Sequence, residues 1–167
     1  MVIDQQRAHE RVLYEHYLKA KEQKPVTTQQ LLFPAHIELS SNDFILVQNL
    51  LNEFKFIGFD MEVFGKNNII VNGTPAELGE FNIQHMLEGV LESYKLNTLD
   101  KKMDVRDNLC RALAKNTSIK YGKELDEKEI QLTITHLLQC ENPLYSPNGK
   151  PTLMEINRDQ LDQFFKK

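Results

Sequence analysis

The chain has 167 residues, 41% of them hydrophobic, which is enough for one domain or two small lobes with a buried core. Its formal net charge of -4 argues against a free-standing binder of nucleic acid or of an anionic membrane, because binding to phosphates depends on neutralisation by Lys and Arg. The 2 cysteines follow no regular spacing, and no apolar run approaches the roughly 18 residues of a membrane span. We therefore expect a cytoplasmic protein that does not contact a membrane.

Apolar residues in the first part of the chain fall at helical and then at extended spacing. Their spacing among charged residues predicts an amphipathic helix over residues 6–23, preceded by a short apolar pair at 2–3 with the character of a strand end. Residues 29–34 form a short apolar run that ends at a proline. Residues 36–39 follow as a predicted strand.

The middle of the chain predicts a helix followed by a β-hairpin. Helical spacing returns over residues 43–55, with Ser41 or Asn42 in place to cap the first turn. Residues 59–63 alternate apolar and acidic side chains. A Gly-Lys-Asn-Asn turn and a second apolar run at 69–71 follow, and this order is typical of a hairpin.

The last part of the chain predicts four more helices and one short strand. The helical segments are residues 83–94, 104–119, 126–140 and 157–165. Asp126 and Glu129 have the spacing of a capping box at the start of the third of these helices. Residues 152–156 form the short strand. Helices mixed with few strands predict an α+β (mixed α/β) fold in two lobes.

Acidic and histidine side chains gather near the start of the chain, at Asp4, His9, Glu10, Glu15 and His16. A zincin helix needs a second histidine four residues after His9, and that residue is Leu13, so this class of metalloprotease is excluded. Composition alone favours a solvated, charge-rich start of a helix.

The same segment resembles the endonuclease motif in the C-terminal domain of the MutL family of DNA mismatch repair proteins. That motif reads Asp-Gln-His-Ala, two residues, Glu, four residues, Glu, and Asp4, Glu10 and Glu15 fall on its acidic positions. Residues 109–111, which include Cys110, resemble the family's Ala-Cys-Arg motif. Residues 146–151 resemble its Cys-Pro-His-Gly-Arg-Pro motif. The resemblance continues over nearly the whole chain in the same order.

The departures from the family pattern fall on metal ligands. In nuclease-competent members, the His of the first motif and the Cys and His of the last help to hold zinc or manganese. These positions are Gln6, Ser146 and Asn148 here, and neutral amides and hydroxyls are poor ligands for a transition metal. Without a metal, little stabilises the charge that develops on a phosphodiester.

The resemblance therefore implies a degenerate endonuclease site with no catalytic residue and no metal. Its remnant is Asp4, Glu10, Glu15, Cys110, Ser146 and Asn148. An active metal-dependent DNA-nicking endonuclease with an altered ligand set, built on Asp4, Glu10 and Cys110, stays open as an alternative.

Residues 29–34 have two interpretations. Periodicity alone favours a buried connector to a strand. In the family, a segment of Gln, any residue, two aliphatic residues, any residue and Pro at this place binds the replicative sliding clamp. The resemblance implies that Gln29 and Pro34 fix the backbone while Leu31 and Leu32 fill an apolar groove of the clamp, with Phe33 as a further candidate.

The resemblance also implies a domain layout and a role. A dimerisation lobe of residues 1–28 and 97–167 would carry an inserted regulatory lobe, residues 29–96, which contains the hairpin. The chain would form a homodimer that tethers two N-terminal ATPase domains, so ATP and Mg²⁺ belong to those domains and this segment needs no cofactor. Expected partners are a second copy, the sliding clamp, the mismatch-recognition protein MutS through the parent protein, and DNA weakly or indirectly. An unrelated α+β binding domain is the other alternative.

Overall fold

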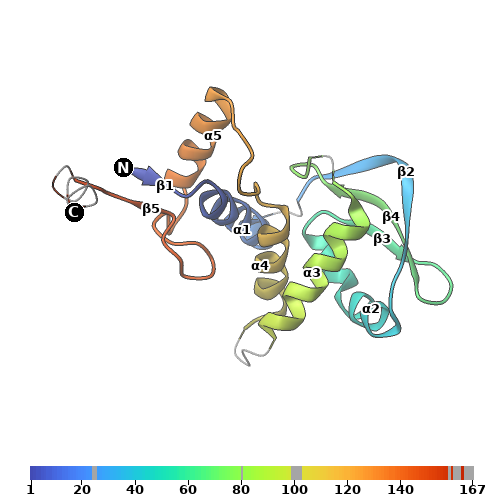
Figure 1. Ribbon diagram of the computed structural model, residues 1–167. Helices are drawn as coiled ribbons and strands as arrows, with labels where there is room; N and C mark the ends of the chain where they lie inside the picture. The colour runs from blue at the N-terminus through green and yellow to red at the C-terminus, as the bar shows by residue number, and fades with distance from the viewer. Residues whose placement is uncertain (24–25, 80, 99–102, 158, 160–162, 164–167) are drawn as a thin grey trace. The chain divides into compact units, whose positions relative to one another are not determined.

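The structure is a computed structural model that describes residues 1–23, 26–79, 81–98, 103–157, 159 and 163 (Figure 1). These ranges contain five helices and two small antiparallel sheets, which confirms the predicted α+β fold. The chain divides into two compact units: Met1–Glu15 with Ser118–Lys167, called unit 1, and His16–Thr117, called unit 2. The lobes implied by the family resemblance have other boundaries, and they stay a prediction.

Unit 2 contains a three-stranded antiparallel sheet in the order β2-β4-β3. The strands are β2 (Thr28–Glu38), β3 (Asp60–Val63) and β4 (Asn68–Pro75). β3 and β4 form the predicted hairpin, in which Met61 pairs with Val71. Alternate residues of β4 are buried, so one face of the sheet contributes to the core of the unit.

The edge strand β2 is longer than predicted, because the apolar run before residues 36–39 belongs to it. Thr28 to Gln30 pair with β4, the register then shifts, and pairing resumes at Ala35. Pro34 lies within this shift, and a proline has no backbone N–H to donate to a ladder. The irregular stretch is therefore the same stretch that resembles a clamp-binding segment.

Three helices complete unit 2: α2 (Ser41–Phe56), α3 (Ile83–Asn97) and α4 (Val105–Thr117). The predicted cap of α2 at Ser41 or Asn42 is wrong, because Ser40 accepts the hydrogen bond from the Asp43 N–H at 3.2 Å. α3 packs against α4. The buried core of the unit includes Val47, Phe54, Phe59, Ile69, Val71, Leu87, Leu91, Leu109 and Leu113.

Unit 1 contains the start of α1 (Gln5–Gln23), α5 (Glu127–Leu138) and a small sheet. In that sheet β1 (Val2–Ile3) pairs antiparallel with β5 (Leu153–Met154). The capping box of Asp126 and Glu129 is confirmed, with both of its hydrogen bonds present. Most of the predicted last helix lies outside the described residues. None of the described helices is long and apolar enough to cross a membrane.

Candidate functional site

Asp4 begins α1 and has structural partners. Its Oδ1 accepts a hydrogen bond from the N–H of Arg7 at 3.0 Å, as an N-cap side chain does, and its Oδ2 lies 3.1 Å from Arg7 Nε. The Tyr121 hydroxyl donates to Oδ2 at 3.1 Å. The N–H of Asp4 donates to the carbonyl of Thr152 at 2.7 Å. The first acid of the motif therefore fixes the beginning of a helix.

Glu10 is 7% exposed and faces the loop that resembles the last motif. Asn148 Nδ2 donates a hydrogen bond to Glu10 Oε1 at 2.8 Å. An amide NH₂ group is a donor and does not coordinate a cation. Asn148 occupies the position of the family's histidine. Glu10 therefore faces a hydrogen-bond donor there rather than a metal ligand.

The loop from Tyr145 to Pro151 is closed by its own hydrogen bonds. Tyr145 and Pro151 form an antiparallel bridge, and the Ser146 N–H donates to the carbonyl of Lys150 at 2.7 Å. The Ser146 hydroxyl oxygen accepts from the Lys150 N–H at 3.2 Å. Gly149 has φ 73°, where a residue without Cβ is favoured. Ser146, at the position of the family's cysteine, thus shapes a turn.

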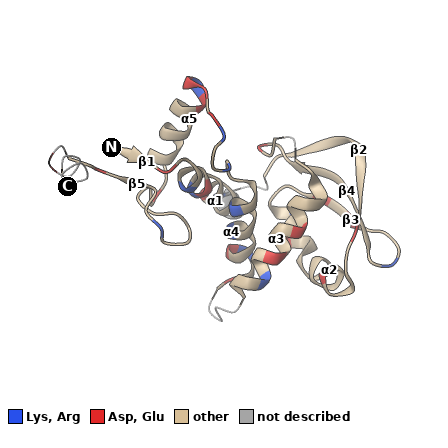
Figure 2. Cartoon of the chain, in the orientation of Figure 1, with Lys and Arg blue, Asp and Glu red and all other residues tan. Residues whose placement is uncertain are grey.

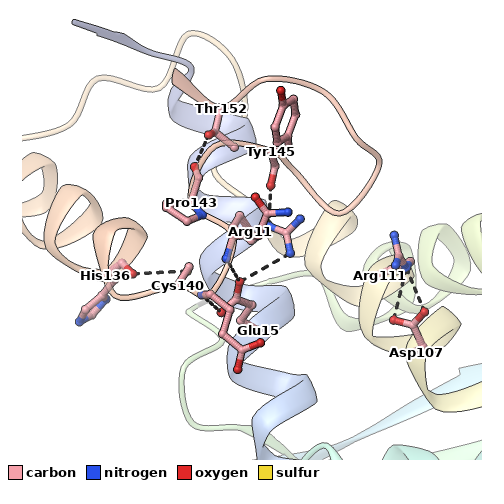
Figure 3. A network of polar contacts seen from close by, with 11 residues as sticks. Arg11, Glu15, Asp107, Arg111, His136, Cys140, Pro143, Tyr145 and Thr152 are labelled. Carbon is pink, nitrogen blue, oxygen red and sulfur yellow. Dashed lines mark hydrogen bonds and ion pairs between the residues drawn. The ribbon is translucent and has the colours of Figure 1, made fainter. Parts of the chain in front are cut away.

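Glu15 and Arg11 are buried charges on α1, 6% and 8% exposed. Glu15 accepts hydrogen bonds from the backbone N–H groups of Glu141 at 2.8 Å and Asn142 at 3.2 Å (Figure 3). Arg11 Nη1 lies 3.6 Å from Glu15 Oε1, and Arg11 Nε donates to the carbonyl of Tyr145 at 2.6 Å. The charge-rich segment is therefore not solvated at Arg11 and Glu15, because these two charges have partners inside unit 1.

The remnant motif residues are divided between the two units. Asp4, Glu10, Glu15, Ser146 and Asn148 belong to unit 1, whereas Cys110 is buried on α4 in unit 2. In the described part of the chain, no group of three or more His, Cys, Asp or Glu side chains is arranged to hold a metal ion.

Gln6, at the position of the first motif's histidine, has a buried Oε1 without a hydrogen-bond partner among the described residues. A neutral amide oxygen of this kind is a weak donor for zinc or manganese. The residues present in unit 1 therefore do not fit the metals of the nuclease-competent family.

The clamp-like segment is exposed at its centre. Leu32 and Phe33 are 88% and 80% exposed, so the buried-connector interpretation is wrong for them. Leu31 is half-buried and lines a hollow of about 480 Å³, together with Gln29 and Met86. Within unit 2, the register shift of β2 turns two large apolar side chains to solvent.

α5 has an apolar face that the described residues of unit 1 leave partly exposed. Leu137 is the buried residue among its 12, while Ile130 and Leu138 are 45% and 61% exposed. Ile130, Ile134 and Leu138 follow one another at intervals of four and form a stripe along one side of the helix. The Glu and Lys side chains of α5 all lie in its first turn (Figure 2), and His136 lies in its last turn.

Sequence reasoning missed the stripe as a surface, although its signal was present. The period of the helix predicts an apolar face, but a period does not show whether the rest of the chain supplies enough apolar partners to bury that face. A contiguous exposed apolar face of this kind is typical of an interaction surface.

Comparison with known proteins places this chain in a family. Residues 1–125 match the family model described as the MutL C terminal dimerisation domain. The chain belongs to that family. This finding excludes the alternative of an unrelated α+β domain.

Several relatives of the MutL family match almost the whole chain. The DNA mismatch repair protein MutL of Prosthecochloris aestuarii is 32% identical over 165 residues, and that of Chlorobium chlorochromatii is 30% identical over 165 residues. The MutL of Bacteroides fragilis is 30% identical over 166 residues. Each match covers 99% of this chain but 26 to 27% of the relative, so the chain spans about a quarter of the length of these relatives.

His9 lies beside the motif residues of this MutL-family chain and accepts a backbone hydrogen bond. The N–H of Ile119 donates to His9 Nδ1 at 3.1 Å, which requires that nitrogen to be unprotonated. Burial, the charge of Lys123 and the nearby His136 lower the pKa of His9 from the usual 6.5 to about 4.

The pKa of His9 predicts an acid-sensitive contribution to stability. Because its folded-state pKa lies below 6.5, the unfolded chain binds a proton first as the pH falls. The contribution of neutral His9 to the free energy of unfolding is therefore complete above pH 6.5. As the pH falls from 6.5 to about 4, the free energy of unfolding decreases by about 1–3 kcal/mol.

Urea unfolding of the wild type and of His9→Asn across this range measures the difference. Asn keeps an acceptor near Nδ1 but does not titrate, so its stability should fall less steeply with acid. Equal slopes for the two proteins would show that His9 does not contribute.

Proposed function

We propose that this chain is the self-association module of a DNA mismatch repair protein and that it works by tethering two copies. The observation that carries the proposal is the stripe of Ile130, Ile134 and Leu138 on α5, in which Ile130 and Leu138 are exposed and Ile134 is half-buried among the described residues. A two-fold axis through such a stripe brings the same apolar side chains of both copies together, so each covers the other. The matched family model is that of a dimerisation domain, which supports the same conclusion.

Tethering gives the module a function without chemistry of its own. Two N-terminal ATPase domains joined to a dimer stay at high effective concentration, so that their ATP-driven closure becomes an intramolecular step. ATP and Mg²⁺ act in those domains, and the mismatch-recognition protein MutS is reached through the parent protein. The net charge of -4 favours weak or indirect contact with DNA.

Co-expression of two differently tagged copies tests the proposal. Purification through one tag should recover both copies in equal amounts. Recovery of one tag alone, from cells that contain both, would show that the chain does not associate with itself.

We also propose that residues 29–34 bind the sliding clamp. The exposure of Leu32 and Phe33 supports this, because only exposed side chains can enter an apolar groove on a partner. The irregular backbone of β2 at these residues supports it as well, since the segment is not tied to β4 along its whole length.

Substitution of Leu32 and Phe33 by Ser together should weaken clamp binding at least about tenfold, because the buried anchors of a peptide motif carry most of its affinity. Phe64→Ser is a matched control, since Phe64 is an exposed aromatic residue of the same unit outside the segment. Titration against purified clamp up to about 100 µM suits a weak contact. Equal loss in the two variants would argue against a specific segment.

We further propose that the chain does not cut DNA. The amide donor that Asn148 presents to Glu10 supports this, as do the structural hydrogen bonds of Asp4 and Glu15. An endonuclease with an altered ligand set needs Asp4, Glu10 and another donor free for a metal.

Supercoiled plasmid incubated with the chain and manganese should stay uncut at the rate of plasmid alone. A nuclease-competent relative in the same buffer is the positive control. Nicking by this chain that disappears in Asp4→Ala and Glu10→Ala would contradict the proposal and favour the endonuclease.

A further inference from the structure

The connector between α5 and β5, residues 139–152, joins two exposed apolar elements of unit 1. α5 ends at Leu138, and β5 contains Met154, which is 53% exposed. Leu144, within the connector, is exposed as well. The path of the connector therefore decides how these apolar groups are presented to a partner.

α1 holds the connector along most of its length. Side chains of α1 contact Glu141, Asn142, Tyr145, Asn148 and Pro151. Four of these five contacts are to backbone N–H or C=O groups, including Arg7 Nη1 donating to the carbonyl of Pro151 at 3.0 Å. A backbone contact fixes the path of the chain whatever side chain the connector carries at that point.

Within the connector, a further contact ties its two ends. The Thr152 hydroxyl donates to the carbonyl of Pro143 (Figure 3). The Thr152 N–H donates to the carbonyl of Leu144 at 3.0 Å. Thr152 is 1% exposed. The strand that carries Met154 is thereby joined to the segment that follows α5.

The burial of Glu10, Arg11 and Glu15 is costly, because each charge loses its hydration. A buried ion pair is often no more stabilising than an apolar replacement, so its use is frequently to specify one arrangement. Here the three side chains specify one arrangement of the connector. Their hydrogen bonds give them a structural role.

We propose that Glu10, Arg11 and Glu15 are positioning residues for the dimer face of this chain. They hold the connector against α1 and so set the direction of the α5 stripe relative to β5. They are buried within unit 1, so their effect on the dimer face is transmitted through the connector. The inference rests on the proposed self-association, because it assigns the residues that shape that interface.

Two-fold symmetry makes the dimer sensitive to this positioning. The same face is used by both copies, so a small displacement of α5 enters the interface twice. A loosened connector should therefore weaken the dimer more than it weakens the fold of unit 1.

The pair of Glu10 and Asn148 allows a test by exchange. Asn148→Asp places a carboxylate against Glu10 and removes the donor, and it should raise the dimer dissociation constant about tenfold or more. Adding Glu10→Gln restores one amide and one carboxylate with their places exchanged. The double variant should return to within about threefold of the wild type. Sedimentation in EDTA keeps a cation from bridging the two carboxylates.

Leu91→Ala is the matched control, because it removes buried side-chain volume from unit 2 and should lower the melting temperature without changing the dissociation constant. Weak association of Asn148→Asp that the second substitution reverses supports the inference. An unchanged dissociation constant in a folded Asn148→Asp, or a weakened dimer that Glu10→Gln does not rescue, overturns it.

Where Asn148→Asp does not fold, Asn148→Ala decides the question. A weaker dimer with a melting temperature near that of the wild type supports positioning, and an unchanged dimer overturns it. A wild type that is monomeric at every concentration contradicts the proposed self-association itself. A wild-type dimer whose dissociation constant does not change on substitution of Asn148 contradicts only the positioning role.

Discussion

Leu138→Glu is expected to convert the dimer into a folded monomer. Leu138 is the most exposed residue of the α5 stripe, so the substitution removes little from the fold of unit 1. In the dimer, however, it would bury a carboxylate among apolar side chains without a partner. We expect the dissociation constant to rise at least about a hundredfold, measured by sedimentation velocity over a concentration series.

Leu132→Glu is the matched control for this prediction. Leu132 is 57% exposed and lies on the same helix, but at 3.6 residues per turn it is on a different side from the stripe. Its dissociation constant should stay within about threefold of the wild type. Equal effects of the two substitutions would show that the stripe is not the interface.

Glu15→Ala is expected to destabilise unit 1 by about 3 kcal/mol. The substitution leaves the backbone N–H groups of Glu141 and Asn142 without their acceptor and leaves the buried Arg11 without its ion-pair partner. Hydrogen exchange measures this directly, because the amide hydrogens of Glu141 and Asn142 should exchange on the order of 100 times faster.

Glu124→Ala gives the comparison for Glu15. Glu124 belongs to the same unit and is exposed, so its loss should change stability by less than about 0.5 kcal/mol. Exchange at Glu141 and Asn142 that is no faster in Glu15→Ala than in Glu124→Ala would refute a structural role for this acid.

Much of the fold follows from local patterns. The 6–23 helix, the hairpin and the capping box of Asp126 and Glu129 depend on side-chain period and on residues close in sequence, and all three are confirmed. The cap of α2 was misplaced by one or two residues because Ser40, Ser41 and Asn42 all have capping side chains, and only backbone geometry selects among them.

The candidate site was less accessible to sequence reasoning. Its residues were identified by resemblance, but the partners of Glu15 are backbone N–H groups 126 and 127 residues away, and backbone groups leave no mark in a sequence. The exposure of Leu32 depends on a register shift against β4. The exposure of the α5 stripe depends on how few apolar groups the other described residues of unit 1 bring to it.

The mass of the wild-type chain in solution tests the central claim of tethering most directly. Sedimentation velocity from about 0.1 to 100 µM should give a single dimeric species at the upper concentrations, with twice the 19.5 kDa mass of one chain. Leu138→Glu should sediment at 19.5 kDa over the same range. A wild type that stays at 19.5 kDa at every concentration would contradict the account.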